Sequence, residues 1–499
     1  MKTIINKFLL ITLGVIVLQL TSCSEEFLET TTSEGIGELA AVQTDQDLMN
    51  IVNGMHRKMY TRTTYGQGYV GWTGGMIMFD SMADDVVHTG TALSWHISGV
   101  RWLNQNIDTS TEVAYPWRFF YDHINNANTI INGAAKAEST TGNNNLKEQA
   151  LGEAYAYRAW CYFQLVQIYS QRYVKGGNNN GLGVVLRLTV GDEPIARGTI
   201  EEVYNQIHKD LNESISKLTG KSKMNNSHFN VNIAKGIKAR VYLTQEEWTL
   251  AAQYAKEARQ SYTLMSAAEY TAGFNDYTNK EWMWGSQIIT DQTDRFGNYG
   301  AFMSRNFNST TIRTAPKAIY VPLFNKFPAT DIRTKNFDPT GKHVLLNLPS
   351  NFQKRPYTSQ KTLAVSTSDS RADVPYMRAA EMYLIEAEAL ARNSKETESK
   401  LIYNQFMQNR DVGYTPTTNI GTVYINEIMD SRRIELWGEG FRWFDLKRLN
   451  LPLVRNNLGS NHIGSVINSV FEVPSTDKRW IFKIPRQEID ANPLCEQNP

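Results

Sequence analysis

The chain of 499 residues has very little cysteine and almost no excess of charge of either sign. Its three cysteines are too few to form a disulfide framework, and no two of them are spaced as Cys-x-x-Cys. It carries 51 Lys and Arg against 50 Asp and Glu, whereas nucleic-acid-binding proteins normally have a basic excess. Apolar residues make up 41% of the chain and aromatic residues 11%. This composition supplies a sizeable core and excludes a mostly disordered chain.

Common catalytic motifs are also missing. The sequence contains no His-Glu-x-x-His, no Gly-x-Ser-x-Gly and no P-loop lysine motif. Gly66 to Gly71 match Gly-x-Gly-x-x-Gly, but no strand precedes them and no amphipathic helix follows, so we interpret them as a flexible loop. Asp84, Asp85 and His88 offer donors for a divalent cation, but adjacent acids more often form a solvated turn or a helix cap, which we favour. We predict no enzyme, no cofactor and no metal site.

The N-terminus has the pattern of a secreted lipoprotein. Two lysines flank the start of an apolar run at residues 8–18, which has the length of a signal-peptide core and is too short to span a bilayer. The sequence Leu-Thr-Ser-Cys at residues 20–23 resembles a bacterial lipobox. We therefore predict a signal peptide at residues 1–22 and lipid attachment at Cys23. The acidic stretch at residues 24–26 is either an export signal to the cell surface or a solvated tether.

Apolar residues recur with a helical period along much of the chain. The periodic stretches lie at residues 48–59, 120–134, 151–169, 203–218, 233–243, 247–260, 377–392, 422–437 and 441–449. Thr199 and Glu202 form a capping box that begins one of these helices. Successive amphipathic helices with small Ala residues on the packing face indicate an all-α fold. We expect tetratricopeptide-like helical hairpins that form a superhelical body, with an irregular helical bundle as the alternative.

Two regions interrupt the helical pattern. Residues 62–113 are rich in Gly and Trp, and residues 262–375 are rich in Thr, Asn, Ser and aromatics. Long irregular segments are usually functional surfaces or disorder, and the aromatic content argues against disorder. We expect an N-terminal helical region at residues 23–261 that includes the first segment. A C-terminal region at residues 262–499 then holds the loop-rich insertion and closing helices at residues 376–449.

Charged residues of both signs alternate with aromatics at residues 431–448. The pattern resembles an active site, but each Arg fork matches a carboxylate, so we predict a network of Arg–carboxylate pairs that holds two helices at a fixed angle. Glu381, Glu386 and Glu388 lie on one predicted helix among Ala and Leu. Paired carboxylates can perform acid–base chemistry, but we favour ion pairs within the body for these three as well.

Residues 431–448 also look like the C-terminal signature of the SusD/RagB family of nutrient-uptake lipoproteins. Other stretches resemble the family in the same order along the chain, at residues 117–134, 153–163, 202–211, 378–389 and 484–499. The resemblance implies a fold of four tetratricopeptide-like hairpins and no enzymatic activity. It also implies a lipoprotein of the outer membrane that faces the cell exterior and caps a SusC-like TonB-dependent transporter. The signature motifs are structural in the family, so they do not locate the ligand.

Aromatic side chains in the two irregular regions are the candidates for a ligand-binding face. Flat Trp and Tyr rings bury the C–H face of a sugar, while amides and acids bind its hydroxyls. The candidates are Trp72, Trp95 and Trp102 in the first region, and Trp282, Trp284, Phe296 and Tyr299 in the second. A core position is the commoner one for any single Trp. Five glycines between Gly66 and Gly75 predict a loop that presents Trp72 without helical constraint.

Three functions remain open at this point. The loop aromatics favour a lipoprotein that captures an oligosaccharide and delivers it to the partner transporter. A peptide-binding lipoprotein of the same family is the first alternative, and a deep cavity with backbone-directed donors would favour it over a shallow aromatic platform. A surface scaffold or adhesin without a small ligand is the second alternative.

Overall fold

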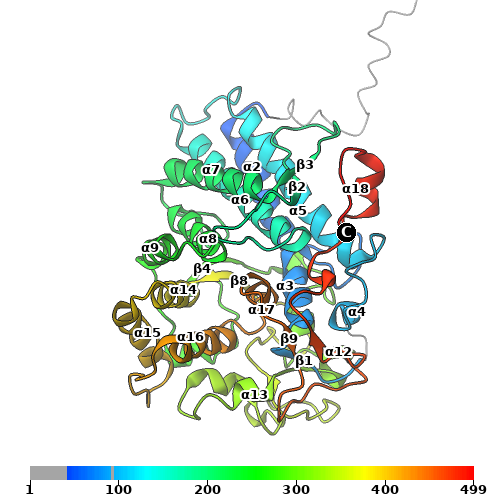
Figure 1. The fold of residues 1–499 in the computed structure, drawn as a ribbon, viewed down its shortest axis with the longest axis vertical. Coiled ribbons are helices and arrows are strands. Elements are labelled where there is room, and N and C mark those ends of the chain that lie inside the picture. Colours follow the sequence, from blue (N-terminus) through cyan, green and yellow to red (C-terminus); the bar gives the residue numbers. More distant parts are fainter. Residues whose placement is uncertain (1–41, 92–94) are drawn as a thin grey trace, which may run out of the picture.

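The computed structural model describes residues 42–91 and 95–499. The predicted signal peptide at residues 1–22 and the predicted lipid attachment site at Cys23 lie outside these ranges. Helices dominate the described part of the chain, and its strands are short (Figure 1). Among the described residues, no helix combines the length and hydrophobicity that crossing a membrane requires.

Long helices occur at both ends of the chain. In the first half they are α2 (Asp45–Lys58), α3 (Gly71–Met82), α5 (Thr111–Gly133), α6 (Asn145–Tyr169), α7 (Ile200–Leu218), α8 (Val231–Thr244) and α9 (Trp248–Arg259). In the second half they are α14 (Ala379–Arg392), α15 (Glu396–Arg410), α16 (Gly421–Glu435) and α17 (Arg442–Arg448). The remaining helices are short: α4 (Ile97–Val100), α10 (Ala267–Tyr270), α11 (Tyr299–Met303), α12 (Thr310–Thr314), α13 (Val321–Phe324) and α18 (Arg486–Ala491).

The strands are confined to small antiparallel pairings. They are β1 (Val86–His88), β2 (Leu182–Val185), β3 (Arg197–Thr199), β4 (Trp282–Ser286), β5 (Lys317–Ile319), β6 (Phe337–Asp338), β7 (Thr358–Ser359), β8 (Val374–Arg378), β9 (Leu453–Val454) and β10 (Glu472–Val473). Single 3-10 turns complete the elements: η2 (Thr290–Gln292), η3 (Ile332–Asn336), η4 (Val344–Leu346) and η5 (Lys478–Trp480).

The long helices pack in succession to form the body. Helix α6 packs against α2, α5 and α7, α8 packs against α9, and α9 packs against α14, which in turn contacts α15 and α16. Figure 1 shows this succession descending along one side of the molecule, from α2 and α7 at the top to α16 lower down. The predicted all-α fold of tetratricopeptide-like hairpins is confirmed. Helix α15 was missing from the predicted set.

Local sequence explains where these helices begin and how closely they pack. The predicted capping box is confirmed, because the Thr199 side chain accepts from the Glu202 backbone N–H and the Glu202 carboxylate accepts from the Thr199 backbone. In α9, Ala251, Ala255 and Ala258 are fully buried. Side chains of this size allow α8 and α14 to approach the helix closely.

Residues 262–375, which we predicted as a loop-rich insertion, contain only short helices, short strands and 3-10 turns. The insertion is tied to the first irregular region through a four-stranded sheet in the order β1-β5-β7-β6. Val86 of β1 is paired with Ile319 of β5. These two paired residues are more than 200 positions apart in sequence, so the two irregular regions form one structural unit beside the helical body.

The prediction that glycines would make residues 66–75 a loop is wrong for its second half. Gly71–Met82 form helix α3, and every residue of this helix is buried. The glycines serve close packing: Gly71 has a φ of +46°, and a Cβ there would lie 2.2 Å from the Met59 carbonyl carbon. A Cβ at Gly74 would lie 2.5 Å from the Gly68 carbonyl oxygen. Trp72 is accordingly held on a buried helix.

The predicted Arg–carboxylate network is confirmed. Asp445 of α17 accepts from Arg432 Nε and Arg448 Nε, both at 2.8 Å, which ties α16 to α17. Glu388 accepts from Arg448 at 2.7 Å. Glu381, Glu386 and Glu388 all form buried ion pairs, with Arg240, Arg259 and Arg448 respectively.

Asp84 and Asp85 form neither the predicted solvated turn nor a helix cap. Both are buried and paired with guanidinium groups, Asp84 with Arg442 at 2.7 Å and Asp85 with Arg433 at 2.6 Å. Although burial opposes the effect, these two arginines hold the pKa of Asp84 well below its usual range. The pair therefore joins the first irregular region to the closing helices and has its charge already compensated.

Candidate ligand-binding face

The structure separates the predicted aromatic candidates into buried and exposed rings. The buried ones are Trp72, Trp102, Trp282, Trp284 and Tyr299. Trp95 is half-buried, and the Phe296 side chain is 42% exposed. A ring must present a face to solvent to stack on a sugar. Of this set, only Trp95 and Phe296 meet that condition in this conformation.

Loop 62–70 forms the centre of the exposed aromatic surface. It is closed by an isolated bridge between Arg62 and Val70, so the intervening residues project from the end of α2 and the start of α3. Tyr65 and Tyr69 are both half-buried on this loop, with ring centroids 6.3 Å apart. The Tyr69 ring contacts the His96 ring edge-on at 5.0 Å. His96 in turn lies 3.0 Å from the Gly68 carbonyl oxygen through Nε2, which fixes the loop against residues 95–96.

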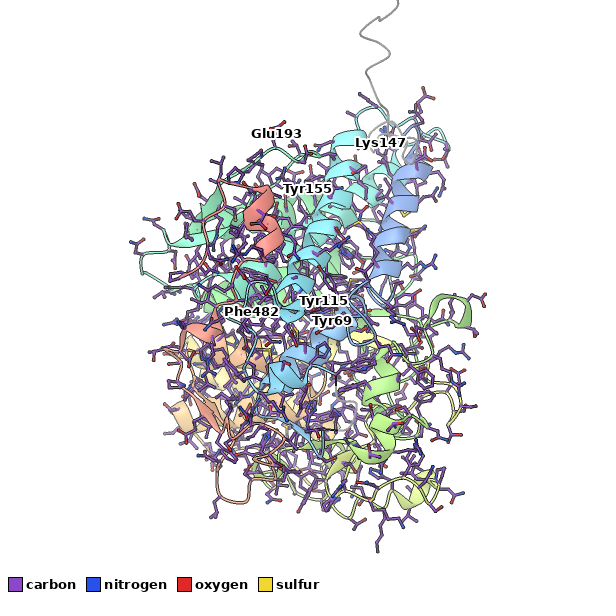
Figure 2. The ribbon with its side chains drawn as sticks, turned by 90° about the vertical axis from the view of Figure 1, so that its right-hand side faces the viewer. Tyr69, Tyr115, Lys147, Tyr155, Glu193 and Phe482 are labelled. Carbon is purple, nitrogen blue, oxygen red and sulfur yellow. The ribbon has the colours of Figure 1, made fainter. Side chains whose placement is uncertain are left out.

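An open hollow of about 300 Å³ lies beside this loop. Tyr65, Tyr115 and Phe119 are its aromatic lining residues, of which Tyr115 and Phe119 are buried, and Lys58, Arg118 and Asp122 are among its charged lining residues. The Tyr115 hydroxyl donates to the Gly71 carbonyl, and the Tyr115 ring contacts Tyr69 at 5.0 Å. Figure 2 shows Tyr69 and Tyr115 beside each other where the loop meets the start of α5. The volume is at the lower end of the roughly 300–1,000 Å³ range of small-molecule sites.

Trp95 and Phe296 continue the surface on the other side of the loop. Trp95 stacks on Phe302 with ring centroids 4.8 Å apart and planes 12° apart, and a Cβ at Gly68 would lie 3.1 Å from its side chain. Phe296 contacts Phe307 at 5.7 Å. Trp95 packs against the same small core cluster that contains Phe307, so both rings rest on one support.

An ion pair connects the two sides of this surface. Arg62, which lines the hollow, donates to Asp294 at 2.6 Å, two residues before Phe296. Although partial burial opposes it, the Phe296 backbone N–H and Arg62 hold the pKa of Asp294 below its usual range. Asp294 is therefore ionised at neutral pH and can accept from ligand hydroxyls. We call Arg62, Tyr65, Tyr69, Trp95, Asp294 and Phe296, together with the adjoining hollow, the aromatic face.

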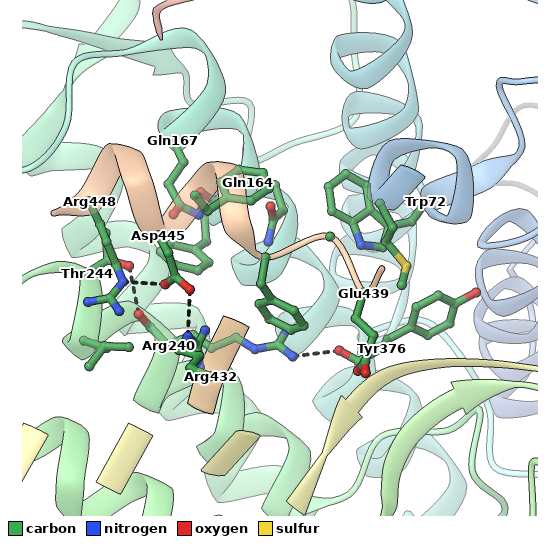
Figure 3. Close-up of a pocket in the computed structure, with 16 residues that line it drawn as sticks. Trp72, Gln164, Gln167, Arg240, Thr244, Tyr376, Arg432, Glu439, Asp445 and Arg448 are labelled. Atoms are coloured by element: carbon green, nitrogen blue, oxygen red, sulfur yellow. Dashed lines mark hydrogen bonds and ion pairs between the residues drawn. The ribbon is translucent and has the colours of Figure 1, made fainter. Parts of the chain in front are cut away.

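Trp72 lines a different space, a pocket of about 50 Å³ between α6, α8 and α17. Figure 3 shows Asp445 between Arg432 and Arg448 on one side of this pocket and Trp72 on the other. Within the described residues, Gln164 Oε1 and Arg432 Nη1 line it without a hydrogen-bond partner. A polar space this small suits a few water molecules and cannot hold a sugar ring.

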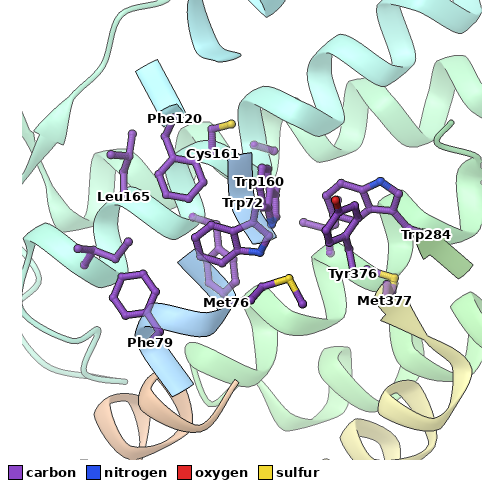
Figure 4. Packing of buried hydrophobic residues seen from close by; sticks show 14 of the residues in the cluster. Trp72, Met76, Phe79, Phe120, Trp160, Cys161, Leu165, Trp284, Tyr376 and Met377 are labelled. Carbon is purple, nitrogen blue, oxygen red and sulfur yellow. The ribbon is translucent and has the colours of Figure 1, made fainter. Parts of the chain in front are cut away.

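The other buried candidates form part of the core. Trp72 packs edge-on against Trp160 at 5.6 Å, and Trp284 contacts Trp160 at 5.3 Å (Figure 4). The Trp102 indole N–H donates to the Met82 carbonyl at 2.9 Å, and the Tyr299 hydroxyl donates to the Gly438 carbonyl at 2.6 Å. These rings connect the irregular unit to the helical body, so we remove them from the proposed ligand face.

Tyr65, Tyr69, Tyr115 and Phe119 were missed as candidates from the sequence. Tyr65 and Tyr69 flank the Gly-Gln-Gly segment, so two aromatic residues around loop glycines were the available signal. Tyr115 and Phe119 are four residues apart on α5, a spacing that is typical of the buried stripe of an amphipathic helix. Only the tertiary fold places that stripe against the loop.

Two protein-family models match the chain. A model described as "Starch-binding associating with outer membrane" matches residues 27–243, and a model described as "SusD family" matches residues 340–499. The chain belongs to the SusD/RagB family. The two matches leave residues 1–26 and 244–339 of this SusD family protein unmatched, and the second stretch includes most of the loop-rich insertion that carries Asp294 and Phe296.

Similar proteins of known description agree with the family assignment. A SusD-like protein of Formosa agariphila is 25% identical over 454 residues, which cover 79% of this chain and 82% of that protein. The crystal structure of a SusD-like carbohydrate binding protein from Bacteroides vulgatus has a TM-score of 0.77 at 21% identity, covering 91% of this chain and 97% of that one. The crystal structure of a SusD superfamily protein from Bacteroides thetaiotaomicron has a TM-score of 0.75 at 22% identity, covering 91% of this chain and 100% of that one. These structures show that the SusD fold extends over nearly the whole chain.

Proposed function

We propose that this SusD/RagB family protein captures an oligosaccharide on the aromatic face and delivers it to a SusC-like TonB-dependent transporter of the outer membrane. The observation that carries the proposal is the hollow beside loop 62–70, together with the solvent-facing rings of Tyr65, Trp95 and Phe296. Apolar ring faces next to charged groups suit a sugar, which has a C–H face and a hydroxyl edge. The protein binds its ligand without cleaving it.

The form of the aromatic face supports a glycan over a peptide. The aromatic residues of the hollow come from α5 and loop 62–70, and the solvent-facing ring of Phe296 is linked to it through the ion pair of Asp294 with Arg62. A peptide site would instead be expected to present backbone-directed donors in a deep cavity. The description of one matching family as starch-binding, and of one structural relative as carbohydrate binding, supports the same choice.

Lipid attachment at Cys23 would hold the protein at the membrane, facing the cell exterior. The lipobox-like sequence at residues 20–23 and the family's association with the outer membrane support this part of the proposal. Cys23→Ala should abolish acylation and release the protein from membranes. The wild-type protein should co-purify with a large outer-membrane β-barrel in mild detergent. Equal incorporation of labelled fatty acid by mutant and wild type would contradict the anchor.

Glycan binding is tested first with an array of oligosaccharides and peptides, and then by calorimetry with the best ligand. Tyr65→Ala and Phe296→Ala each remove one exposed ring. Since an aromatic contact contributes about 1 kcal/mol beyond area burial, affinity should fall by roughly tenfold in each variant. The melting temperature should change little, because neither ring is in the core.

Tyr254→Ala is the matched control, because Tyr254 is a half-buried tyrosine on α9, in the helical body. It should leave glycan affinity unchanged. If Tyr65→Ala and Phe296→Ala both bind the glycan normally, the aromatic face is the wrong surface. If the array shows peptides bound and glycans ignored, the ligand class is wrong although the face can be right. Cleavage of the bound oligosaccharide by highly purified protein would contradict a purely binding role.

A further inference from the structure

Two histidines and a glutamate meet in the helical body, away from the aromatic face. His56 lies on α2, Glu153 on α6, and His228 in the segment before α8. The side chains of all three are nearly or fully buried. Glu153 is 97 residues from His56 and 75 from His228 in sequence, so only the fold brings the three together.

The three side chains point their donor atoms at one another. His56 Nε2 lies 3.1 Å from Glu153 Oε2 and 3.3 Å from His228 Nδ1. His228 Nδ1 lies 2.9 Å from Glu153 Oε1. In a tetrahedral zinc site with Zn–N bonds of about 2.0–2.1 Å, neighbouring donor atoms are roughly 3.3 Å apart. The two histidine nitrogens are thus at the spacing of a zinc site, and one donor atom from each of the three residues can be chosen so that all lie within 4.8 Å of one another.

Further hydrogen bonds orient two of these groups. The Tyr157 hydroxyl lies 2.6 Å from His56 Nδ1, the ring nitrogen that faces away from Glu153. The Glu153 carboxylate accepts from Gln149 Nε2 at 2.7 Å and from the Phe229 backbone N–H at 2.9 Å. Metal-binding histidines and carboxylates in proteins are held by outer partners of this kind.

A hollow at the surface lies one side chain away from the cluster. Gln149, which contacts Glu153, lines an open hollow of about 530 Å³ formed by residues around the start of α6 and the end of α7. Asn145 and Lys221 are among the other residues that line it. Gln149 therefore contacts both this hollow and the Glu153 carboxylate.

We propose that His56, Glu153 and His228 bind one zinc ion that ties α2, α6 and the segment before α8 together. Two imidazole nitrogens and one carboxylate oxygen form a donor set that suits zinc, whereas calcium and magnesium prefer oxygen ligands alone. The site is separate from the aromatic face, so its role is to stabilise the helical body. The three ligands follow no metal-binding spacing in the sequence, and our prediction of no metal site is therefore revised.

Zinc binding is tested on the purified mature protein after treatment with a chelator. Titration with ZnCl₂ against a chromophoric zinc chelator should give one site per chain, and zinc should raise the melting temperature. CaCl₂ and MgCl₂ should do neither. His228→Gln should weaken zinc binding by more than the roughly 10–100-fold that loss of an outer partner costs, and Tyr157→Phe should fall within that range.

His208→Gln is the control variant, because His208 is a partly buried histidine of α7 whose Nε2 lies 2.6 Å from a single side-chain amide oxygen, Gln245 Oε1. It should bind zinc like the wild type. Cobalt(II) added to the wild type should give the visible absorption of a tetrahedral N/O site, a readout that needs no variant to fold. Absence of stoichiometric zinc binding by the wild type, or equal binding by His228→Gln and the wild type, would overturn the proposal. The cluster would then be a closed hydrogen-bonded network. Glycan affinity does not enter either outcome.

Discussion

The helical body and the irregular unit bury their backbones in different ways. In the body, helices such as α7 and α9 satisfy their own backbone polar groups and pack through apolar stripes and small Ala residues. In the irregular unit and the segments that cover it, many backbone carbonyls have no periodic partner. Long buried cations supply the missing donors. Irregular chain can therefore be packed inside a large protein when Arg and Lys side chains take over the role of secondary structure.

Arg455 shows this device most clearly. Its guanidinium is fully buried and donates to the carbonyls of Met82 and Ala83 at 2.9 Å and of Val100 at 2.8 Å. Burial lowers the pKa of Arg455 to about 10. Lys447 donates in the same manner to the carbonyls of Ser170 and Trp480. These cations act as multiple hydrogen-bond donors to backbone.

The largest effect is expected where buried cations and carboxylates form a closed network. Arg378, Arg410 and Lys361 are paired with Glu281, Glu435 and Glu439, three positive groups with three negative ones. Arg378→Met leaves this buried set with one uncompensated negative charge. We expect the free energy of unfolding, measured with urea and tryptophan fluorescence, to fall by about 3–5 kcal/mol.

An exposed ion pair provides the control for that experiment. Lys395 lies 3.8 Å from Glu398, and both side chains are about half exposed to solvent. Lys395→Met should change the free energy of unfolding by less than about 0.5 kcal/mol. A loss below 1 kcal/mol in Arg378→Met would show that the network does not hold the irregular unit to the closing helices.

Sequence reasoning succeeded for the helical body because its signals are local. Short-range patterns alone predict the capping box of Thr199 and Glu202 and the packing alanines of α9. The structure contains both features at the predicted residues. The alternating charges at residues 431–448 also indicated ion pairs correctly, because Arg and carboxylates in such density must be paired when buried. What the pattern did not reveal was the partner from a distant segment, such as Asp84 for Arg442.

The second prediction compares the two ways of burial directly. Arg455→Met leaves the carbonyls of Met82, Ala83 and Val100 without this donor, and we expect a loss of about 2–4 kcal/mol. Leu211→Ala in α7 removes a fully buried apolar side chain and should cost about 2–5 kcal/mol. Hydrogen exchange distinguishes the two variants of similar cost. Amides near residues 81–83 and 99–102 should exchange faster only in Arg455→Met, and amides of α7 only in Leu211→Ala. Identical exchange patterns would remove the distinction between the two regions.

The third prediction uses two glycines with opposite surroundings. Gly71 has a φ of +46°, and a Cβ would meet the Met59 backbone at 2.2 Å, so Gly71→Ala should destabilise the protein by at least about 1–2 kcal/mol. Gly54 is an exposed residue of helix α2 with no atom within 4 Å of such a Cβ. Gly54→Ala should therefore stabilise by about 0.5–1 kcal/mol. Thermal unfolding of the two variants checks both signs, and a stabilising Gly71→Ala would contradict the close-packing role of the α3 glycines.

The candidate ligand face was harder to predict than the fold. Trp72 and Trp95 were equally plausible from the sequence, because both lie in a glycine-rich, aromatic stretch. Their burial depends on whether the surrounding glycines make a loop or allow a helix to pack closely, and at Gly71 the deciding contact is with Met59 of a different element. Asp294, two residues before Phe296, forms an ion pair with Arg62. No local spacing in the sequence predicts that pair.

The smallest effect is expected at Lys317, a buried residue of β5 that lies beneath the aromatic face. Its ammonium lies 4.1 Å from the centroid of Phe302, the ring on which Trp95 stacks, and burial lowers its pKa to about 7. Since the unfolded chain titrates near 10.5, it binds more protons than the folded protein between about pH 7 and 10.5, and the free energy of unfolding should rise with pH in that window. Lys317→Met should reduce this slope by up to about 1.4 kcal/mol per pH unit, whereas Lys395→Met should not.

Because burial also lowers the pKa of Lys447 to about 7, the wild-type slope contains contributions from both residues. The measured quantity is therefore the difference in slope between the variant and the wild type. An unchanged slope in Lys317→Met would show that this ammonium stays protonated beneath the ligand face.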